Sequence, residues 1–333
     1  MSDARARVLV ARAVFPEVVE RLRTHFTVDD NPADTIFTAA ELSARLHGKQ
    51  GALTTGSERI DTALLVANPQ LRAVCNMAVG YNNIDIDACT THGVLATNTP
   101  YVLTETTADF GFALMMAAAR RIAESEHFLR RGEWTRWSYD MFTGSDVHGA
   151  TLGILGMGRI GQGIARRGAL GFGMRVIYHN RSRLAAALEA PLGARYVDKA
   201  TLLREADHLV LVLPYSAASH HAIGAAELAL MKPTATLTNI ARGGIVDDAA
   251  LAAALRQRQI AAAGLDVFEG EPAVHPHLLA LPNVVLTPHI ASASVRTRRA
   301  MAELAADNLI AALTGAAVPS PINPGVLAGV RRA

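Results

Sequence analysis

The stretch TLGILGMGRIGQGIARRG, residues 151–168, joins a short apolar run to three closely spaced glycines and a helical pattern. The apolar residues 152–155 predict a buried strand, and the residues after Gly161 predict a helix. A G-x-G-x-x-G motif alone is weak evidence, but between a strand and a helix it is typical of a dinucleotide site. The stretch therefore predicts the start of a Rossmann nucleotide-binding domain. The alternative is a glycine-rich turn without a ligand.

Each part of this motif has a separate physical role. Gly156 permits a tight turn, Gly158 lets the backbone approach a pyrophosphate, and Gly161 lets the helix pack close to the strand. The backbone N–H groups at the start of the helix then face the anion. The predicted phosphate cradle comprises Gly156, Met157, Gly158, Arg159, Ile160 and Gly161.

The next predicted strand, MRVIYHNRSR at residues 174–183, ends without an acidic residue. A carboxylate at this place binds the ribose hydroxyls of NAD, whereas an arginine pairs with the 2′-phosphate of NADP. We therefore expect NADPH to be preferred over NADH, with Arg181 on the phosphate and Asn180 and Ser182 as hydrogen-bond donors. The alternative is that Arg181 and Arg183 are solvated loop charges and that both cofactors are used.

Three later strand ends carry ionisable residues. ATLTNIARGG places Arg242 after one strand, AAGLDVFEGEP places Glu271 after the next, and VVLTPHIAS places His289 after the last. Because ligands bind beyond the carboxyl ends of parallel strands, we expect these three residues, hereafter the trio, to share one rim. Separately, each could be a surface ion pair, a helix cap or a core histidine.

The trio suits the reduction of a 2-keto acid. Arg242 can bind the substrate carboxylate through its planar guanidinium and polarise the adjacent carbonyl. His289 can donate a proton to the ketone oxygen as hydride reaches the carbon. Glu271 would orient the imidazole and favour its charged form, which raises the histidine pKa.

Alternating β-branched runs and helical segments extend in both directions and predict an α/β protein with two doubly wound parallel sheets. The first lobe contributes RVLVARA, GALTTG, LRAVCNMAVG and HGVLATNT as strands. The second contributes six, namely TLGILGMG, MRVIYHN, HLVLVLP, ATLTNIA, AAAGLDVF and NVVLTPH. One long helical segment is expected over residues 104–134.

The terminal helical segment, residues 294–315, is too short to form a domain and is expected to pack on the first lobe. We therefore predict a discontinuous flavodoxin-like substrate domain, residues 1–100 and 290–333. It surrounds a Rossmann domain at residues 101–289.

Bulk properties exclude several classes of function. The 333 residues carry a net charge of +2 without a basic block, which argues against nucleic acid and membrane surfaces as partners. Two cysteines are too few for a disulfide framework, and no apolar segment is long enough to cross a bilayer. These features predict a cytoplasmic protein.

Several motifs together resemble the D-isomer-specific 2-hydroxyacid dehydrogenases over essentially the whole chain. They are VGYNNIDIDAC, LGILGMGRIGQGIARR, NIARGGIVDDAAL, AAAGLDVFEGEP and TPHIASAS. The resemblance implies that Arg242 binds substrate, that His289 is the acid/base and that Glu271 is its partner.

The resemblance also assigns residues outside the trio. Asp266 is expected to reach the nicotinamide amide, and backbone amides near Val79 and Gly80 are expected to hold the substrate carboxylate. The loop LTTGS, which contains Thr55, would line the same cleft. Further cofactor contacts are expected from Thr107, Leu213, Pro214, Ala241 and Arg242.

A closer similarity, to bacterial glyoxylate/hydroxypyruvate reductases that also reduce 2-ketogluconate, comes from TPYVLTETTADFGFALMMAAARR, GSDVHG and YHNRSR. It implies an NADPH-preferring reductase of these keto acids and a homodimer built on the helix from Thr104 and the tryptophan loop after it. Ala291 departs from the glycine frequent in the family, which is expected to tighten the cleft near the nicotinamide.

Two other functions stay open. The chemistry could serve another substrate, such as D-lactate or a phosphoglycerate, or the chain could be a nucleotide-sensing protein like the corepressors of the superfamily. A metal site is not expected, because neither His220-His221 nor the pair His275 and His277 has a third ligand at a convincing spacing.

Overall fold

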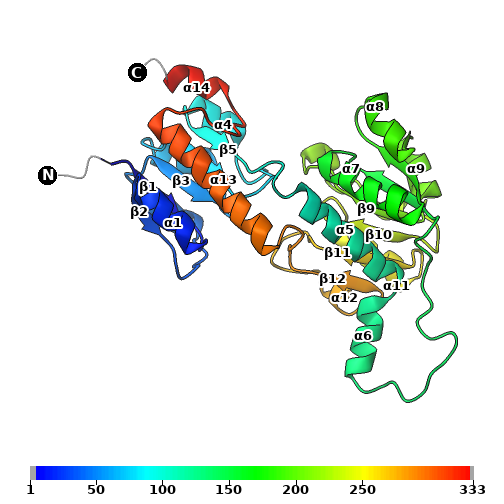
Figure 1. Cartoon of the computed structure of the whole chain (residues 1–333). Helices are drawn as coiled ribbons and strands as arrows, with labels where there is room; N and C mark the ends of the chain where they lie inside the picture. Colours follow the sequence, from blue (N-terminus) through cyan, green and yellow to red (C-terminus); the bar gives the residue numbers. More distant parts are fainter. Residues whose placement is uncertain (1–4, 331–333) are drawn as a thin grey trace. The chain divides into compact units, whose positions relative to one another are not determined.

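The computed structural model describes residues 5–330, which divide into two compact units (Figure 1). Unit 1 comprises residues 5–103 and 294–330, and unit 2 comprises Thr104–Ala293. The predicted boundaries, residues 100 and 290, lie a few residues from these limits. Among the described residues, no helix is both long and apolar enough to cross a membrane.

Unit 1 contains a five-stranded parallel sheet in the order β2-β1-β3-β4-β5, which is the flavodoxin-like order. Its strands are β1 (Arg7–Val10), β2 (Thr27–Asp30), β3 (Gly51–Thr54), β4 (Ala73–Asn76) and β5 (Leu95–Thr97). The sequence prediction omitted β2. Its residues TVDD are half-buried or exposed and carry two acids, so they lack the apolar pattern of a strand.

Helices cover both faces of this sheet. They are α1 (Pro16–Arg23), α2 (Ala39–Leu46), α3 (Thr62–Ala67), α4 (Ile86–Thr91), α13 (Val295–Thr314) and α14 (Gly325–Val330). Alternate strand residues point to opposite cores: Val8 and Val10 pack with α1 and α13, whereas Leu9 packs with α2 and α3. The expected packing of the terminal helix α13 on the first lobe is thus confirmed.

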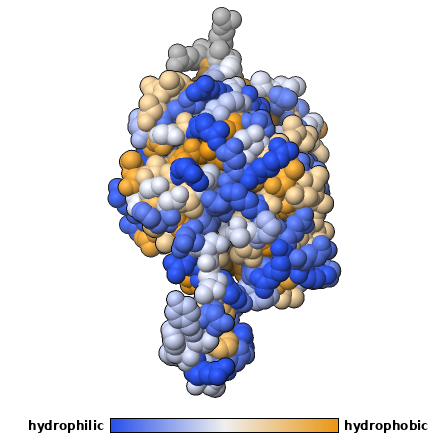
Figure 2. All heavy atoms as spheres, turned by 90° about the vertical axis from the view of Figure 1, so that its right-hand side faces the viewer, coloured by the Kyte–Doolittle hydropathy of each residue, from blue (hydrophilic) through white to orange (hydrophobic). Residues whose placement is uncertain are grey.

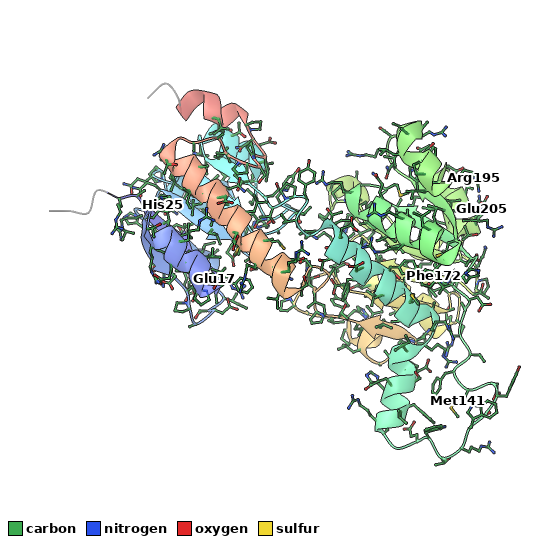
Figure 3. All side chains as sticks on the ribbon, in the orientation of Figure 1. Glu17, His25, Met141, Phe172, Arg195 and Glu205 are labelled. Carbon is green, nitrogen blue, oxygen red and sulfur yellow. The ribbon has the colours of Figure 1, made fainter. Side chains whose placement is uncertain are left out.

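Unit 2 contains a seven-stranded parallel sheet in the order β12-β11-β10-β9-β6-β7-β8, which extends the Rossmann order by one strand. Its strands are β6 (Thr151–Leu155), β7 (Arg175–His179), β8 (Arg195–Tyr196), β9 (His208–Leu211), β10 (Thr236–Asn239), β11 (Ala262–Leu265) and β12 (Val284–Leu286). The prediction of six strands omitted β8, which has only two residues. Figure 3 shows Arg195 of this strand beside Glu205, with which it forms an ion pair.

Unit 2 has α-helices on both faces of its sheet and one that extends beyond it. They are α5 (Thr104–Ala119), α6 (Ile122–Arg130), α7 (Arg159–Arg166), α8 (Ala186–Glu189), α9 (Lys199–Glu205), α10 (Ala225–Leu228), α11 (Asp248–Arg256) and α12 (Pro276–Leu279). One core lies under α5 and α7, where Phe112 contacts Phe172 at 4.8 Å between ring centroids. The other lies under α9, α10 and α11.

The single helix predicted over residues 104–134 is wrong. The structure ends α5 at Ala119 and starts α6 at Ile122, because Arg121 between them adopts a left-handed conformation with φ 54°. Residues 131–150 then form a loop. This break turns α6 and the following loop away from the sheet of unit 2 (Figure 1).

Candidate active site

The phosphate cradle lies between β6 and α7. A Cβ atom on Gly156, whose φ is +103°, would lie 2.6 Å from the backbone nitrogen of Leu213. A Cβ on Gly161 would lie 2.4 Å from the carbonyl oxygen of Gly156, whereas one on Gly158 would meet nothing within 4 Å. The turn is therefore tight on two sides and open at Gly158, which fits the close approach of a pyrophosphate.

A second observation also fits a bound dinucleotide. Thr107 on α5 is buried, and its hydroxyl has no hydrogen-bond partner among the described residues. Buried polar groups are normally paired, so an orphaned hydroxyl indicates a contact that a ligand can supply. Its neighbour Ala108 packs against Gly163 of α7, which places Thr107 beside the helix that leads from the cradle.

The loop after β7 is fixed to the cradle by side chains. The amide oxygen of Asn180 accepts a hydrogen bond from the backbone N–H of Met157 at 2.6 Å. Arg183 pairs with the buried carboxylate of Glu189, which also accepts the Tyr178 hydroxyl at 2.5 Å. Arg183 is therefore already engaged within the protein.

Arg181 in the same loop is exposed, and no acid among the described residues forms an ion pair with it. Ser182 beside it is exposed as well. His179 lies at the end of β7, where a domain that binds NAD would carry an acid. Its Nδ1 lies 2.8 Å from the carbonyl oxygen of Val197. The loop thus presents an arginine and a hydroxyl without an acidic side chain.

His289 and Glu271 of the trio are in contact. The Nδ1 atom of His289 lies 2.8 Å from a carboxylate oxygen of Glu271, and the imidazole is 46% exposed. The other carboxylate oxygen of Glu271 accepts the backbone N–H of Phe268 at 2.9 Å. The pair therefore orients the imidazole while leaving part of it accessible to a substrate.

Electrostatics keep Glu271 ionised. Burial opposes its ionisation, but the hydrogen bonds from His289 and the Phe268 N–H and the charges of His289 and Arg242 lower the pKa of Glu271 overall. Desolvation lowers the pKa of Arg242, and the charge of Glu271 opposes that change. An arginine stays charged despite such a shift, so the site holds a cation beside a carboxylate–imidazole pair.

The segment that carries Arg242 is held by Asn239, the last residue of β10. The Asn239 amide accepts the backbone N–H of Ala241 at 3.0 Å and donates to the carbonyl of Arg242 at 3.1 Å. A guanidinium nitrogen of Arg242 donates to the carbonyl of Ala241 at 2.7 Å. Asn239 therefore fixes the turn from which the arginine projects.

Asp266 holds the segment that carries His289. Its fully buried carboxylate accepts three hydrogen bonds, from the Thr287 hydroxyl at 2.7 Å and from the N–H groups of Ile290 and Ala291 at 2.8 and 2.9 Å. Its carbonyl accepts the N–H of His289 at 2.9 Å. Burial raises the pKa of Asp266, and these hydrogen bonds oppose that rise.

These bonds explain the backbone of His289, which has φ 54° although it is not glycine. Such conformations cost free energy and persist where neighbouring contacts enforce them, often at functional sites. The positioning role of Asp266 was missed from the sequence. Its place at the end of β11, one strand from His289, was the only available signal.

The remaining predicted residues lie at the carboxyl ends of strands or on α5. Leu213 and Pro214 follow β9, and Ala241 follows β10. In unit 1, Thr55 follows β3, and its hydroxyl and N–H both donate to Glu58.

Val79 and Gly80 follow β4 in unit 1. Their carbonyl oxygens accept the side-chain amides of Asn98 and Asn76 at 2.8 and 3.0 Å. With the carbonyls fixed in this way, the N–H groups of this loop are the backbone donors available to an anion.

A cavity of about 250 Å³ lies in unit 2 at the amino ends of the strands, opposite the edge that carries the trio. It is lined by the first residues of β10 and β11, Thr236 and Ala262, and by Arg121 and Glu124, which pair with each other. None of the trio lines it, so the cavity is separate from the chemistry.

The chain is similar to known proteins over nearly all of its length. Residues 112–291 match the family described as D-isomer specific 2-hydroxyacid dehydrogenase, NAD binding domain. The chain is 46% identical over 327 residues to glyoxylate reductase of Thermococcus kodakarensis, covering 97% of this chain and 98% of the relative. It is 48% identical over 334 residues to glyoxylate reductase of Aeropyrum pernix, covering 97% of each.

A solved structure is similar over nearly the same length. The NADPH-dependent glyoxylate/hydroxypyruvate reductase of Sinorhizobium meliloti, in complex with NADP and malonate, superposes with a TM-score of 0.85 at 37% identity. The match covers 96% of this chain and 97% of that one.

Proposed function

The chain belongs to the D-isomer-specific 2-hydroxyacid dehydrogenases, which makes it an NAD(P)-dependent oxidoreductase, and we propose that it reduces small 2-keto acids to D-2-hydroxy acids. Glyoxylate is the first candidate substrate, followed by hydroxypyruvate and 2-ketogluconate. The observation that carries the proposal is the 2.8 Å contact between His289 and Glu271, beside the charge of Arg242.

In this proposal a nicotinamide cofactor, when bound, supplies the hydride. Arg242 binds the carboxylate of the keto acid and polarises the neighbouring carbonyl. As the carbonyl π bond breaks and a C–H bond forms, His289 donates the proton that makes the O–H bond. Glu271 stabilises the imidazolium before transfer, and the exposed imidazole then regains a proton from solvent.

The cofactor proposed is NADPH. The exposed Arg181 and Ser182 and the absence of an acid in the loop after β7 support it. The amide oxygen of Asn180 is bonded to the cradle, which leaves its nitrogen as the end that could donate to a phosphate. The NADP complex of the Sinorhizobium meliloti relative is consistent with this choice.

Cofactor and substrate contacts outside the trio are proposals of the same kind. The N–H groups of Val79 and Gly80 and the hydroxyl of Thr55 would bind the substrate carboxylate. Asp266 would accept from the nicotinamide amide at Oδ2, which now accepts only the N–H of Ala291, whereas Oδ1 already accepts two hydrogen bonds. Ala291, 7% exposed, would narrow the space beside it.

A homodimer is also proposed, built on the helical segment from Thr104 and the tryptophan loop after it, with α6 and the following loop, residues 122–145, as the exposed part of the interface. Figure 2 shows this segment standing out from the surface of unit 2. Its exposed apolar and aromatic side chains are Ile122, Leu129, Trp134, Trp137 and Tyr139. Such a patch is typical of an interface. Sedimentation should give a dimer, and the double variant Leu129→Asp, Trp137→Asp should give a monomer.

A cytoplasmic location is proposed from the thiols. Cys75 and Cys89 are free and buried, and burial raises the pKa of each thiol to about 12. A protein with two unreactive thiols and no disulfide suits a reducing compartment.

The test is the initial rate of NADPH and NADH oxidation with glyoxylate, hydroxypyruvate and 2-ketogluconate. Turnover of glyoxylate with a preference for NADPH is expected. Turnover of D-lactate or a phosphoglycerate alone would show that the enzyme acts on another substrate of the family. Tight cofactor binding without turnover of any keto acid would favour a nucleotide sensor.

A further inference from the structure

Two histidines and a glutamate outside the trio come together at the carboxyl edge of unit 2. His220 and His221 lie in the loop after β9, and Glu269 lies in the loop after β11. One ligand atom from each lies within 4.8 Å of the other two. His221 Nε2 lies 3.0 Å from a carboxylate oxygen of Glu269.

The backbone around these residues is held firmly. His221 has φ 48°, and its N–H donates to the carbonyl of Gly244 at 2.7 Å. Ile223, two residues later, donates its N–H to the carbonyl of Ile245 at 3.1 Å and forms a parallel bridge with Val246. The left-handed conformation of a non-glycine residue is thus enforced, as is common at binding sites.

A partner orients the outer histidine. The hydroxyl of Tyr215 lies 3.2 Å from Nδ1 of His220. With Nδ1–H donating to the hydroxyl oxygen, Nε2 of His220 keeps its lone pair for an ion, as in histidine ligands of metals.

The two imidazoles stack at 3.9 Å between centroids and 22° between planes. One ring must turn to aim both nitrogen lone pairs at a single ion. His220 is exposed and has room to do so.

Local charge favours a cation here. Glu269 donates its backbone N–H at 3.1 Å to Asp248, a carboxylate that is only 6% exposed. A cation bound at Glu269 would therefore lie near a second carboxylate.

From this cluster we propose a binding site for one divalent ion of the Zn²⁺, Co²⁺ or Ni²⁺ class, with His220, His221 and Glu269 as ligands. Imidazole nitrogens with one carboxylate suit these metals, whereas Mg²⁺ and Ca²⁺ prefer oxygen ligands alone. The ion takes the place of the proton shared by His221 and Glu269, and water completes its coordination.

The site joins two segments that serve the trio. Gly244, which binds the backbone of His221, lies two residues after Arg242, and Glu269 lies two residues before Glu271. A bound ion therefore clamps the loop after β9 to the loop that carries Glu271. The proposal does not depend on the substrate or on the proposed function.

The test is titration of the untagged full-length chain, freed of metal, with Zn²⁺ against a chromophoric chelator. One ion per chain is expected. The variants His220→Ala, His221→Ala and Glu269→Gln should each weaken binding at least about tenfold, and Tyr215→Phe should weaken it by less than the loss of a ligand. Zn²⁺ should also raise the thermal midpoint of the native chain, because it binds the folded state.

Two controls locate the ion. His277→Ala alters the other histidine pair, whose rings lie 5.2 Å apart, and should leave Zn²⁺ affinity unchanged. His289→Gln tests the rival location at the trio and should also leave it unchanged. Equal affinity in the native chain and in His220→Ala, or a loss in either control as large as in Glu269→Gln, would overturn the proposal. Binding of Mg²⁺ as tightly as Zn²⁺ would overturn it as well.

Discussion

Both sheets are parallel and doubly wound, yet their carboxyl edges present different chemistry. In unit 1, Asn76 and Asn98 hold the carbonyls of Gly80 and Val79, so that the loop after β4 offers backbone N–H groups. In unit 2, the corresponding polar side chains hold loops that present ionisable groups.

The supporting device is the same in both units. Asn239 fixes the turn of Arg242, and Asp266 fixes the turn of His289, each by bonds from a strand-end side chain to loop backbone. The difference teaches that an apolar α/β scaffold specifies only where a loop leaves the sheet. A short polar side chain at the strand end then holds that loop, so that the group it presents keeps one position.

If this division is right, removing His289 has the largest effect. His289→Gln should lower kcat with a keto acid by roughly 10²–10⁴-fold, because general acid catalysis by a positioned side chain is worth that much. Cofactor affinity, measured by fluorescence titration, should stay unchanged. The control His92→Gln alters an exposed histidine of unit 1 and should keep native activity. A fall in kcat of less than tenfold for His289→Gln would contradict the assignment of the chemical step to the carboxyl edge of unit 2.

The phosphate cradle lies at the carboxyl edge of unit 2. Like the loop after β4 in unit 1, it presents backbone N–H groups rather than side chains. Gly161→Ala places a Cβ 2.4 Å from the Gly156 carbonyl and should destabilise the fold by about 1–3 kcal/mol. Gly158→Ala points its Cβ into open space and should leave the thermal midpoint of the free chain unchanged while weakening NADPH at least about tenfold, through backbone that can no longer approach a phosphate. Equal thermal midpoints for the two variants would contradict this assignment.

Arg181→Ala tests the side chain proposed for the 2′-phosphate. Loss of one charge-assisted contact at an exposed site should raise the KM for NADPH by about tenfold and leave that for NADH nearly unchanged. Arg195→Ala, which removes another exposed arginine of the neighbouring strand β8, is the matched control and should affect neither. Equal losses with both cofactors would refute the role of Arg181.

Asn98→Ala tests the unit 1 edge. Without its hydrogen bond to the Val79 carbonyl, the loop should bind the substrate carboxylate less well, raising KM about threefold to tenfold while kcat changes little. Steady-state kinetics with glyoxylate measure both constants. A fall in kcat at constant KM would show that unit 1 also acts on the chemical step.

Glu271→Gln should give the smallest change in catalysis. The amide oxygen can still accept the hydrogen bond of His289 but carries no charge, so kcat should fall by less than about fivefold, because a half-exposed ion pair is worth at most about 1 kcal/mol. An unchanged kcat would mean that Glu271 only orients the ring.

The same variant has a stability signature. The pKa of Glu271 is lowered below its usual value of 4.5, so its pairing stabilises the fold above that value. The advantage of the native chain over Glu271→Gln should be present at neutral pH and lost as the pH falls through the lowered pKa. Thermal melts across the acid range measure it.

Much of the fold was predictable because buried parallel strands are short apolar runs between helices. The prediction missed β2 and β8, because β2 carries Asp29 and Asp30 and β8 has only two residues. The sequence prediction also missed the break after α5. The left-handed conformation of Arg121 has no sequence signal within a helical pattern rich in alanine and methionine.

The trio was predictable from its three strand ends, and the contact of His289 with Glu271 agrees with that prediction. The histidine–glutamate cluster was not predictable, because Glu269 is separated by 48 residues from its contact His221. Only the neighbouring positions of strands β9, β10 and β11 bring such residues together.

The two buried thiols have a practical consequence for spectroscopy. Cys75 and Cys89 are 0% exposed, and with pKa values of about 12 they hold on the order of 10⁻⁵ of their population as thiolate at pH 7. Maleimide dyes react with thiolate, so the native chain should react with them only very slowly. A cysteine placed at the exposed His127 of α6 would be the one fast-reacting thiol, and its fluorophore would report burial of that helix in real time.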